Sequence, residues 1–134
     1  MTISSHEIYE PELFRQNIFV FGSNLAGRHG AGAALWAARY AGAIYGDGYG
    51  LQGRSFAIPT KDHNLITLDL EVIQMYVHEF VEYALHQPEF HFYVTPIGCG
   101  LAGHKPKYIA PMFEDLVGEP NVTLPKAFSR ILRP

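Results

Sequence analysis

Strand-like and helix-like segments alternate along this chain, and this alternation is the feature that most restricts its fold. Short apolar runs, typical of buried strands, occur at residues 17–22, 55–59, 89–96 and 121–125. Segments with helical character lie between them, at residues 30–42, from Thr67 or Asp69 to about His86, and from Pro106 onward. This order predicts an α/β fold: a mixed, mostly parallel sheet with helices on both faces.

Two of the expected helices carry a clear apolar face. In the helix that ends near His86, apolar residues recur at helical spacing, at Ile73, Val77, Phe80, Val81 and Ala84. After Pro106, which suits a first helical turn, the apolar face is broader and comprises Tyr108, Ile109, Met112, Phe113, Leu116 and Val117. We expect both faces to pack on the sheet.

Length and charge limit the function. The 134 residues fit a single domain, 1–134, and a hydrophobic content of 48% is enough for a core. The formal charge of −3 gives no basic face, so we expect no general nucleic-acid binding. One cysteine, Cys99, excludes an intrachain disulfide and favours a reducing compartment.

The sequence shows no targeting or membrane-spanning segment. Residues 1–14 have no basic segment followed by an apolar one, so we expect no signal peptide. No uncharged apolar run approaches the roughly 20 residues that span a bilayer. The sequence therefore predicts a soluble, cytoplasmic protein with no membrane partner.

The first strand runs into a glycine-rich segment, "FVFGSNLAGRHGAGAALW" (19–36). It nearly fits a P-loop, but Arg28 and His29 replace the lysine and the hydroxyl residue that such a loop needs, which argues against a P-loop NTPase. "GAGAAL" (30–35) is only half of a dinucleotide fingerprint, because Leu35 replaces the last small residue.

A second glycine-rich segment, "IGCGLAGH" (97–104), follows the third strand and precedes the next helix. Both segments should therefore lie at the same edge of the sheet, where α/β folds bind ligands. Glycines let backbone N–H groups approach an anion, and a helix N-terminus adds its positive end. The alternative is that Gly30 and Gly32 only permit close packing of strand and helix. Two such loops favour phosphate binding.

Together these segments resemble the macro domain family over roughly residues 17–125. The resemblance rests on Phe21-Gly22-Ser23-Asn24, on Gly30-Ala31-Gly32-Ala33 and on Pro96-Ile97-Gly98-Cys99-Gly100-Leu101-Ala102-Gly103. It implies a three-layer macro-like domain that binds ADP-ribose or a derivative, free or on an ADP-ribosylated macromolecule. We expect no cofactor and no metal. The implied ligand-binding residues are Gly22, Ser23, Asn24, Gly30, Ala31, Gly32, Thr60, Gly98, Cys99, Gly100, Leu101 and Gly103.

"FAIPTKD" (56–62) brings the chain nearest to the branch of terminal ADP-ribose protein glycohydrolases. This resemblance implies that Lys61 attacks the ribose C1″ and that an aspartate after "GCGL" assists. Ala102 occupies the position of that aspartate. Asp47, which we take as the second catalytic candidate, Asp62, His29 and His104 are possible substitutes that spacing does not place.

Other chemistries have weaker support. Cys99 and His104 could form a nucleophilic dyad, although a free cysteine is more often a packing residue. "HEFVEYALH" (78–86) begins like a zinc motif but has Glu82 where the second histidine belongs. Two other classes stay open: a Rossmann-like nucleotide-processing hydrolase, and a non-catalytic phage or bacterial accessory module that has kept only the fold.

Overall fold

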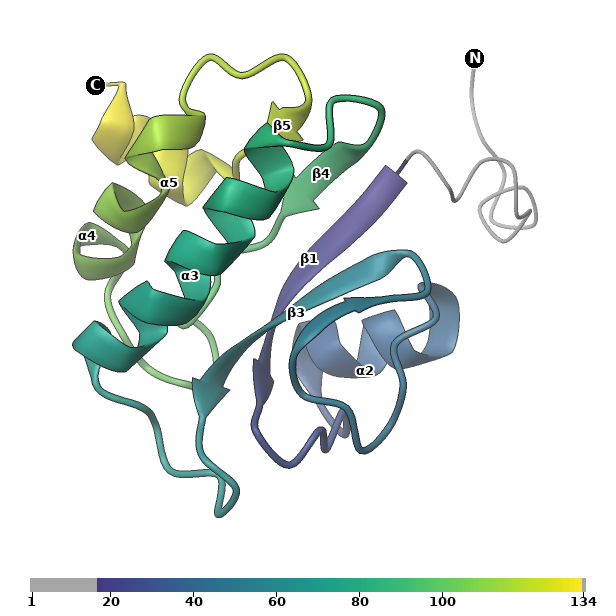
Figure 1. Ribbon diagram of the computed structural model, residues 1–134. Coiled ribbons are helices and arrows are strands. Elements are labelled where there is room, and N and C mark those ends of the chain that lie inside the picture. Colours follow the sequence, from purple (N-terminus) through teal and green to yellow (C-terminus); the bar gives the residue numbers. More distant parts are fainter. Residues whose placement is uncertain (1–16, 134) are drawn as a thin grey trace.

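The structure is a computed structural model that describes residues 17–133 (Figure 1). Its elements, in chain order, are β1 (Asn17–Asn24), α2 (Gly32–Tyr40), β2 (Gly50–Gln52), β3 (Ser55–Lys61), α3 (Leu70–Leu85), β4 (His91–Val94), α4 (Pro106–Ile109), the 3-10 helix η2 (Ala110–Leu116), β5 (Val122–Thr123) and α5 (Lys126–Leu132). Residues 1–14, where we expect no signal peptide, lie outside this range.

The strands form a five-stranded mixed sheet in the order β2–β3–β1–β4–β5. The central strand β1 pairs in parallel with β3 and β4, and β4 pairs in parallel with β5. Only β2 is antiparallel, on the outer side of β3. The predicted α/β class with a mostly parallel sheet is confirmed. The carboxyl ends of β1 and β3 point to the same edge, the lower one in Figure 1.

Two strand predictions are corrected. The segment 44–53, which its glycine content predicts to be a loop because four of its ten residues are glycine, contains the edge strand β2. The strand expected to end at Pro59 continues to Lys61, with Pro59 paired to Ser23 of β1. Because β2 reaches only Ala57, the missing N–H of Pro59 costs no ladder bond on that outer side.

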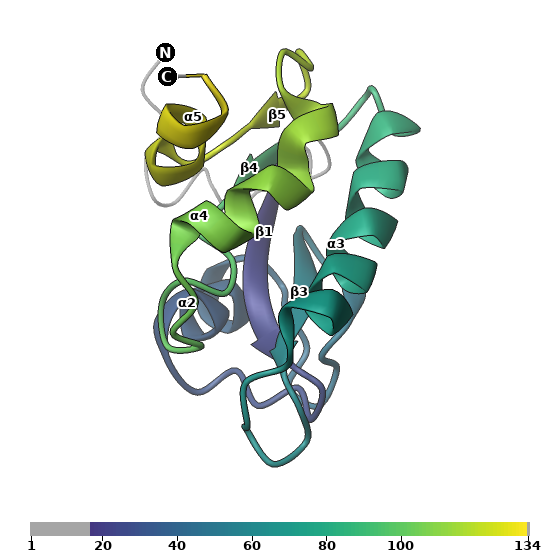
Figure 2. The same ribbon diagram turned by 90° about the vertical axis from the view of Figure 1, so that its left-hand side faces the viewer.

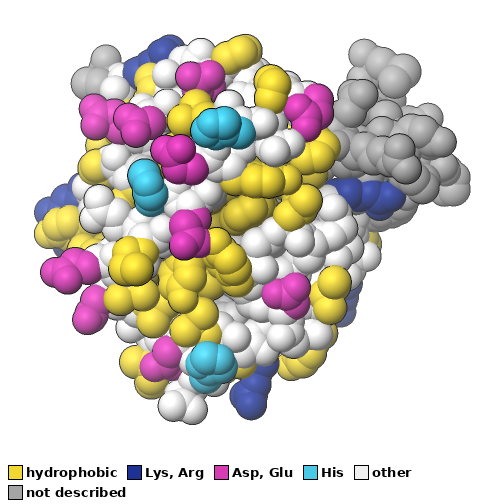
Figure 3. Space-filling view, viewed as in Figure 1, with side chains coloured by type: hydrophobic (Ala, Val, Ile, Leu, Met, Phe, Trp, Pro, Cys, Tyr) yellow, Lys and Arg dark blue, Asp and Glu magenta, His cyan; other side chains and the backbone are white. Residues whose placement is uncertain are grey.

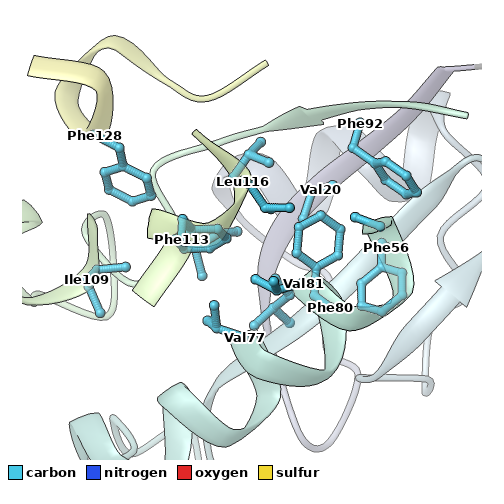
Figure 4. Packing of buried hydrophobic residues seen from close by; sticks show 14 of the residues in the cluster. Val20, Phe56, Val77, Phe80, Val81, Phe92, Ile109, Phe113, Leu116 and Phe128 are labelled. Carbon is cyan, nitrogen blue, oxygen red and sulfur yellow. The ribbon is translucent and has the colours of Figure 1, made fainter. Parts of the chain in front are cut away.

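Residues of β1 alternate between two apolar clusters, as a strand buried on both faces requires. Ile18 and Val20 belong to the larger cluster, which includes buried residues of α3, η2 and α5 (Figure 4). Phe21 belongs to the smaller cluster on the other face, where it meets alanines of α2. Figure 2 shows α2 and α3 on opposite sides of the sheet. Helices therefore cover both faces, as predicted.

The helical predictions hold with two changes. All five residues of the predicted α3 stripe are buried, and Pro106 occupies the first turn of α4. Tyr108, expected on the apolar face, is 50% exposed and lies beside the Lys107 ammonium instead. The helix α5 was not expected; its Phe128 completes the larger core cluster. Within residues 17–133, no helix has both the length and the apolar character to cross a bilayer.

Candidate functional site

A cavity of about 750 Å³ lies at the carboxyl ends of β1, β3 and β4, beside the start of α2. Its size falls within the range of roughly 300–1,000 Å³ typical of small-molecule sites. Both glycine-rich segments contribute to its wall. The lining residues are Gly22, Ser23, Asn24, Arg28, Gly30, Ala31, Gly32, Ala33, Ala34, Tyr45, Thr60, Lys61, Leu65, Thr95, Pro96, Ile97, Gly98, Cys99, Gly100, Leu101 and Ala102.

The structure brings together nearly all of the residues expected to bind a ligand. Of the twelve, only Gly103 is outside the lining. The two catalytic candidates are separated: Lys61 lines the cavity, whereas Asp47 does not. The carboxylate of Asp47 instead accepts a hydrogen bond from the backbone N–H of Tyr49, at 3.3 Å. Asp47 therefore has a turn-forming position in this structure.

The floor of the cavity is where three strand ends meet. A β-carbon on Gly22 of β1 would lie 3.5 Å from the backbone nitrogen of Gly98 and 3.5 Å from Cγ2 of Thr60. The Thr60 hydroxyl donates to the carbonyl of Ser23 at 3.1 Å. On the other side of β1, both the N–H and the hydroxyl of Thr95 donate to the carbonyl of Val20. These bonds tie the ends of β3 and β4 to β1, next to the two glycine segments.

The loop that follows β1 is closed by Asn24. Its side-chain oxygen accepts from the N–H of Arg28 and its side-chain nitrogen donates to the carbonyl of Arg28, each at 2.9 Å. Asn24 is 8% exposed. Its amide therefore fixes the loop that carries Arg28 to the cavity wall.

Behind this loop lies a second one, residues 44–49, which supports it by very close backbone packing. Gly27 adopts a left-handed φ of 70°, and a β-carbon there would lie 2.3 Å from the nitrogen of Asp47. Nε2 of the buried His29 donates to the carbonyl of Asp47 at 3.0 Å, and the Ser23 hydroxyl donates to the carbonyl of Gly48. A β-carbon on Gly48 would likewise lie 2.0 Å from the carbonyl oxygen of Asn24. Only glycine fits such contacts, so Gly48 supports the cavity without lining it.

The amino-terminal end of α2 forms part of the cavity wall. The helix begins at Gly32, Ala31 at the N-cap makes no side-chain capping bond, and the first turn contains no acidic residue. The first backbone N–H groups of a helix lack intrahelical partners, and the helix dipole is positive there. A β-carbon on Gly32 would lie 3.7 Å from Cδ1 of Leu101, so the two glycine segments meet at this point.

The side-chain charges of the lining have one sign. Arg28 and Lys61 are its charged residues, and no Asp or Glu is among the lining residues that the structure describes. Within residues 17–133, neither cation forms an ion pair. By contrast, carboxylates are scattered over the face that carries α3, with Lys and Arg at its margins (Figure 3). In a chain with a net charge of −3, this cavity suits an anion.

Cys99 lines the cavity, but its environment does not activate it. Burial raises the pKa of the Cys99 thiol above its ordinary value, which disfavours the reactive thiolate. Nε2 of His104 faces the carbonyl of Leu68, at 3.1 Å, and His104 is not a lining residue. The structure therefore gives no support to a Cys99–His104 dyad.

The mouth of the cavity has an apolar rim. Tyr45, Leu65 and Leu101 line the cavity and are 67%, 40% and 71% exposed. Sequence reasoning identified Leu101 through the glycine motif but missed Leu65, because no sequence signal ties the loop after β3 to the cavity. A ligand that fills this site would meet two cations, backbone amides and these apolar side chains.

Metal binding has no support in residues 17–133, where no group of three or more His, Cys, Asp or Glu side chains could hold an ion. Comparisons with protein families, curated proteins and solved structures gave no match to this chain. The cavity is therefore the feature of this chain that bears most directly on its function.

Proposed function

We propose that the cavity binds ADP-ribose or a closely related nucleoside diphosphate derivative. The observation that carries this proposal is the composition of the lining: two glycine-rich segments, two cations and no described carboxylate around a cavity of about 750 Å³. Backbone amides at a helix N-terminus and in glycine loops favour phosphate groups.

A diphosphate suits the site better than a single phosphate. The two glycine segments approach each other where Gly32 lies against Leu101, so amides from both sides can reach adjacent phosphates. The cavity has room beyond a diphosphate, and its rim offers Tyr45 and Leu65 to a sugar or a base. We also propose that the sheet, with α2 on one face and α3 on the other, is a macro-like arrangement.

Hydrolysis of an ADP-ribosyl bond through Lys61 is the second candidate function, favoured by the place of Lys61 in the cavity wall. Attack by its amine on the ribose C1″ would form a C–N bond, break the bond from C1″ to the attached group and release that group. Water would then have to cleave the C–N bond to release ADP-ribose and regenerate the Lys61 amine. The amine must first lose a proton, and the described lining offers no carboxylate to take it. Binding is therefore the proposed function.

Calorimetric titration with ADP-ribose, with AMP and ADP as controls, tests the proposal. We expect micromolar binding of ADP-ribose that is clearly tighter than binding of AMP. Equal affinity for AMP would contradict the diphosphate assignment. The absence of heat with all three ligands would favour a non-catalytic module that has kept the fold alone. Turnover of simple nucleoside monophosphates would favour the nucleotide-processing hydrolase.

A further inference from the structure

One residue at the cavity has an unusual backbone conformation. Leu65 has a φ of 63°, and it is the only non-glycine residue between 17 and 133 with a positive φ; the nine others are glycines. A bulky L-residue is strained there, because its β-carbon crowds the backbone. All the other described residues with a positive φ are glycines. A leucine at position 65 is therefore unexpected on backbone grounds.

The surrounding turn holds Leu65 in this conformation. The carboxylate of Asp62 accepts hydrogen bonds from the N–H groups of Asn64 and Ile66, at 2.8 and 3.0 Å. The backbone N–H of Leu65 donates to the carbonyl of Asp62, and the N–H of Asp62 donates to the carbonyl of Ile66. The turn thus fixes the backbone, and a glycine would satisfy it with less strain.

The same turn joins two parts of the cavity. Lys61, at its start, forms a β-bridge with Thr67, at its end. The hydroxyl of Thr67 donates to the carbonyl of Ala102 at 2.9 Å. The turn therefore spans from the end of β3 to the second glycine segment, and it brings Leu65 into the lining that contains Lys61.

Core packing does not compensate for this strain. Leu65 belongs to neither apolar cluster and is 40% exposed. Leu65 is instead part of the cavity lining. We propose that Leu65 is a specificity-determining residue, which packs on the sugar or base of the nucleoside diphosphate and keeps water from that part of the site. This inference rests on the proposed function.

The test compares three variants by thermal unfolding and by calorimetric titration with ADP-ribose. Leu65→Gly removes both the side chain and the strain; we expect a melting temperature no lower than that of the wild type and a dissociation constant raised about fivefold or more. Leu65→Met keeps an apolar side chain and should retain affinity within about twofold. Ile66→Gly is the matched control, because Ile66 is more exposed, at 63%, and does not line the cavity.

The outcomes separate the two proposals. Absence of ADP-ribose binding by the wild-type protein would overturn the proposed function and, with it, the role of Leu65. Wild-type binding that Leu65→Gly leaves unchanged would overturn the role of Leu65 alone. If Ile66→Gly weakened binding as much as Leu65→Gly, the loss would come from the turn and not from a ligand contact. That result, or a failure of Leu65→Met to retain affinity, would also overturn the proposed role of Leu65.

Discussion

Gly48 lies directly against the carbonyl oxygen of Asn24, so close that a β-carbon on Gly48 would come within 2.0 Å of that oxygen. Two backbone segments touch there, with no side chain between them. One belongs to the loop that carries Arg28 to the cavity, and the other to the loop that supports it. The glycine is required by this contact and not by its own φ angle, which is not left-handed.

Gly48→Ala should therefore destabilise the protein strongly. Since the β-carbon meets backbone and not a flexible side chain, one of the two loops must move, and we expect a loss of about 2 kcal/mol or more in the free energy of unfolding. Urea denaturation measures this loss. Gly100→Ala is the matched control, because a β-carbon there meets no atom within 4 Å and φ is not positive. If both variants lost the same stability, the contact at Gly48 would not be the cause.

Removal of either cation from the cavity should weaken ligand binding without unfolding the protein. Arg28→Gln and Lys61→Gln each remove a positive charge from a lining that has no described carboxylate. We expect an increase in the Kd for ADP-ribose of about tenfold, or about 1.4 kcal/mol, for each variant. Calorimetry in low salt is the measurement. Arg39→Gln makes the same charge change on the exposed last turn of α2, outside the lining, and an equally large effect there would point to long-range charge alone.

The single thiol should report on the cavity through its reactivity. Burial raises the pKa of Cys99, so at neutral pH alkylation should be slower than in the urea-unfolded chain. In the folded protein, the pH at which the alkylation rate begins to rise should be higher than in the unfolded chain. The unfolded thiol ionises first, so this group favours the folded state less as pH rises through that range. Saturating ADP-ribose should slow alkylation further; equal rates with and without ligand would place the ligand away from Cys99.

Loss of the His29 side chain should lower stability by about 2 kcal/mol. The ring is 1% exposed, its Nε2 donates to the carbonyl of Asp47, and it lies 5.4 Å from the ring of Phe21. His29→Ala leaves a void and removes a tie between the two loops, although Gln52 still donates to the Asp47 carbonyl. Chemical denaturation should show the loss, and His63→Ala, at an exposed position, should change stability by less than about 0.5 kcal/mol.

The parts of the fold that depend on periodicity could be predicted from the sequence. The apolar stripe of α3 follows from helical spacing, because one face of the helix is buried. The parallel strands appear as continuous apolar runs, because both of their faces are buried. The strand β2 could not be predicted, because its three residues lie among glycines and are selected by pairing with β3. The helix α5 was missed for a similar reason: it has only seven residues, and short helices depend on tertiary packing, here through Phe128.

The candidate site was predictable in outline and not in detail. Glycines after two parallel strands placed both loops at one edge, which the cavity confirms. Spacing did not place Asp47, the second catalytic candidate, and the packing of loop 44–49 keeps it outside the lining. The positive φ of Leu65 leaves no mark in composition or spacing. These features arise from contacts between distant segments, which a local pattern does not encode.

The central position of β1 also has a consequence for the order of assembly. Since β1 lies between β3 and β4, the first strand described must wait for partners that follow it by many residues, and non-local parallel pairing of this kind is slow. During synthesis, the amide groups near Gly30 can meet those near Gly100 only after the chain has been made beyond residue 100. A partly made chain therefore cannot hold the proposed ligand in the complete cavity. Acquisition of binding would report that both halves of the sheet have come together.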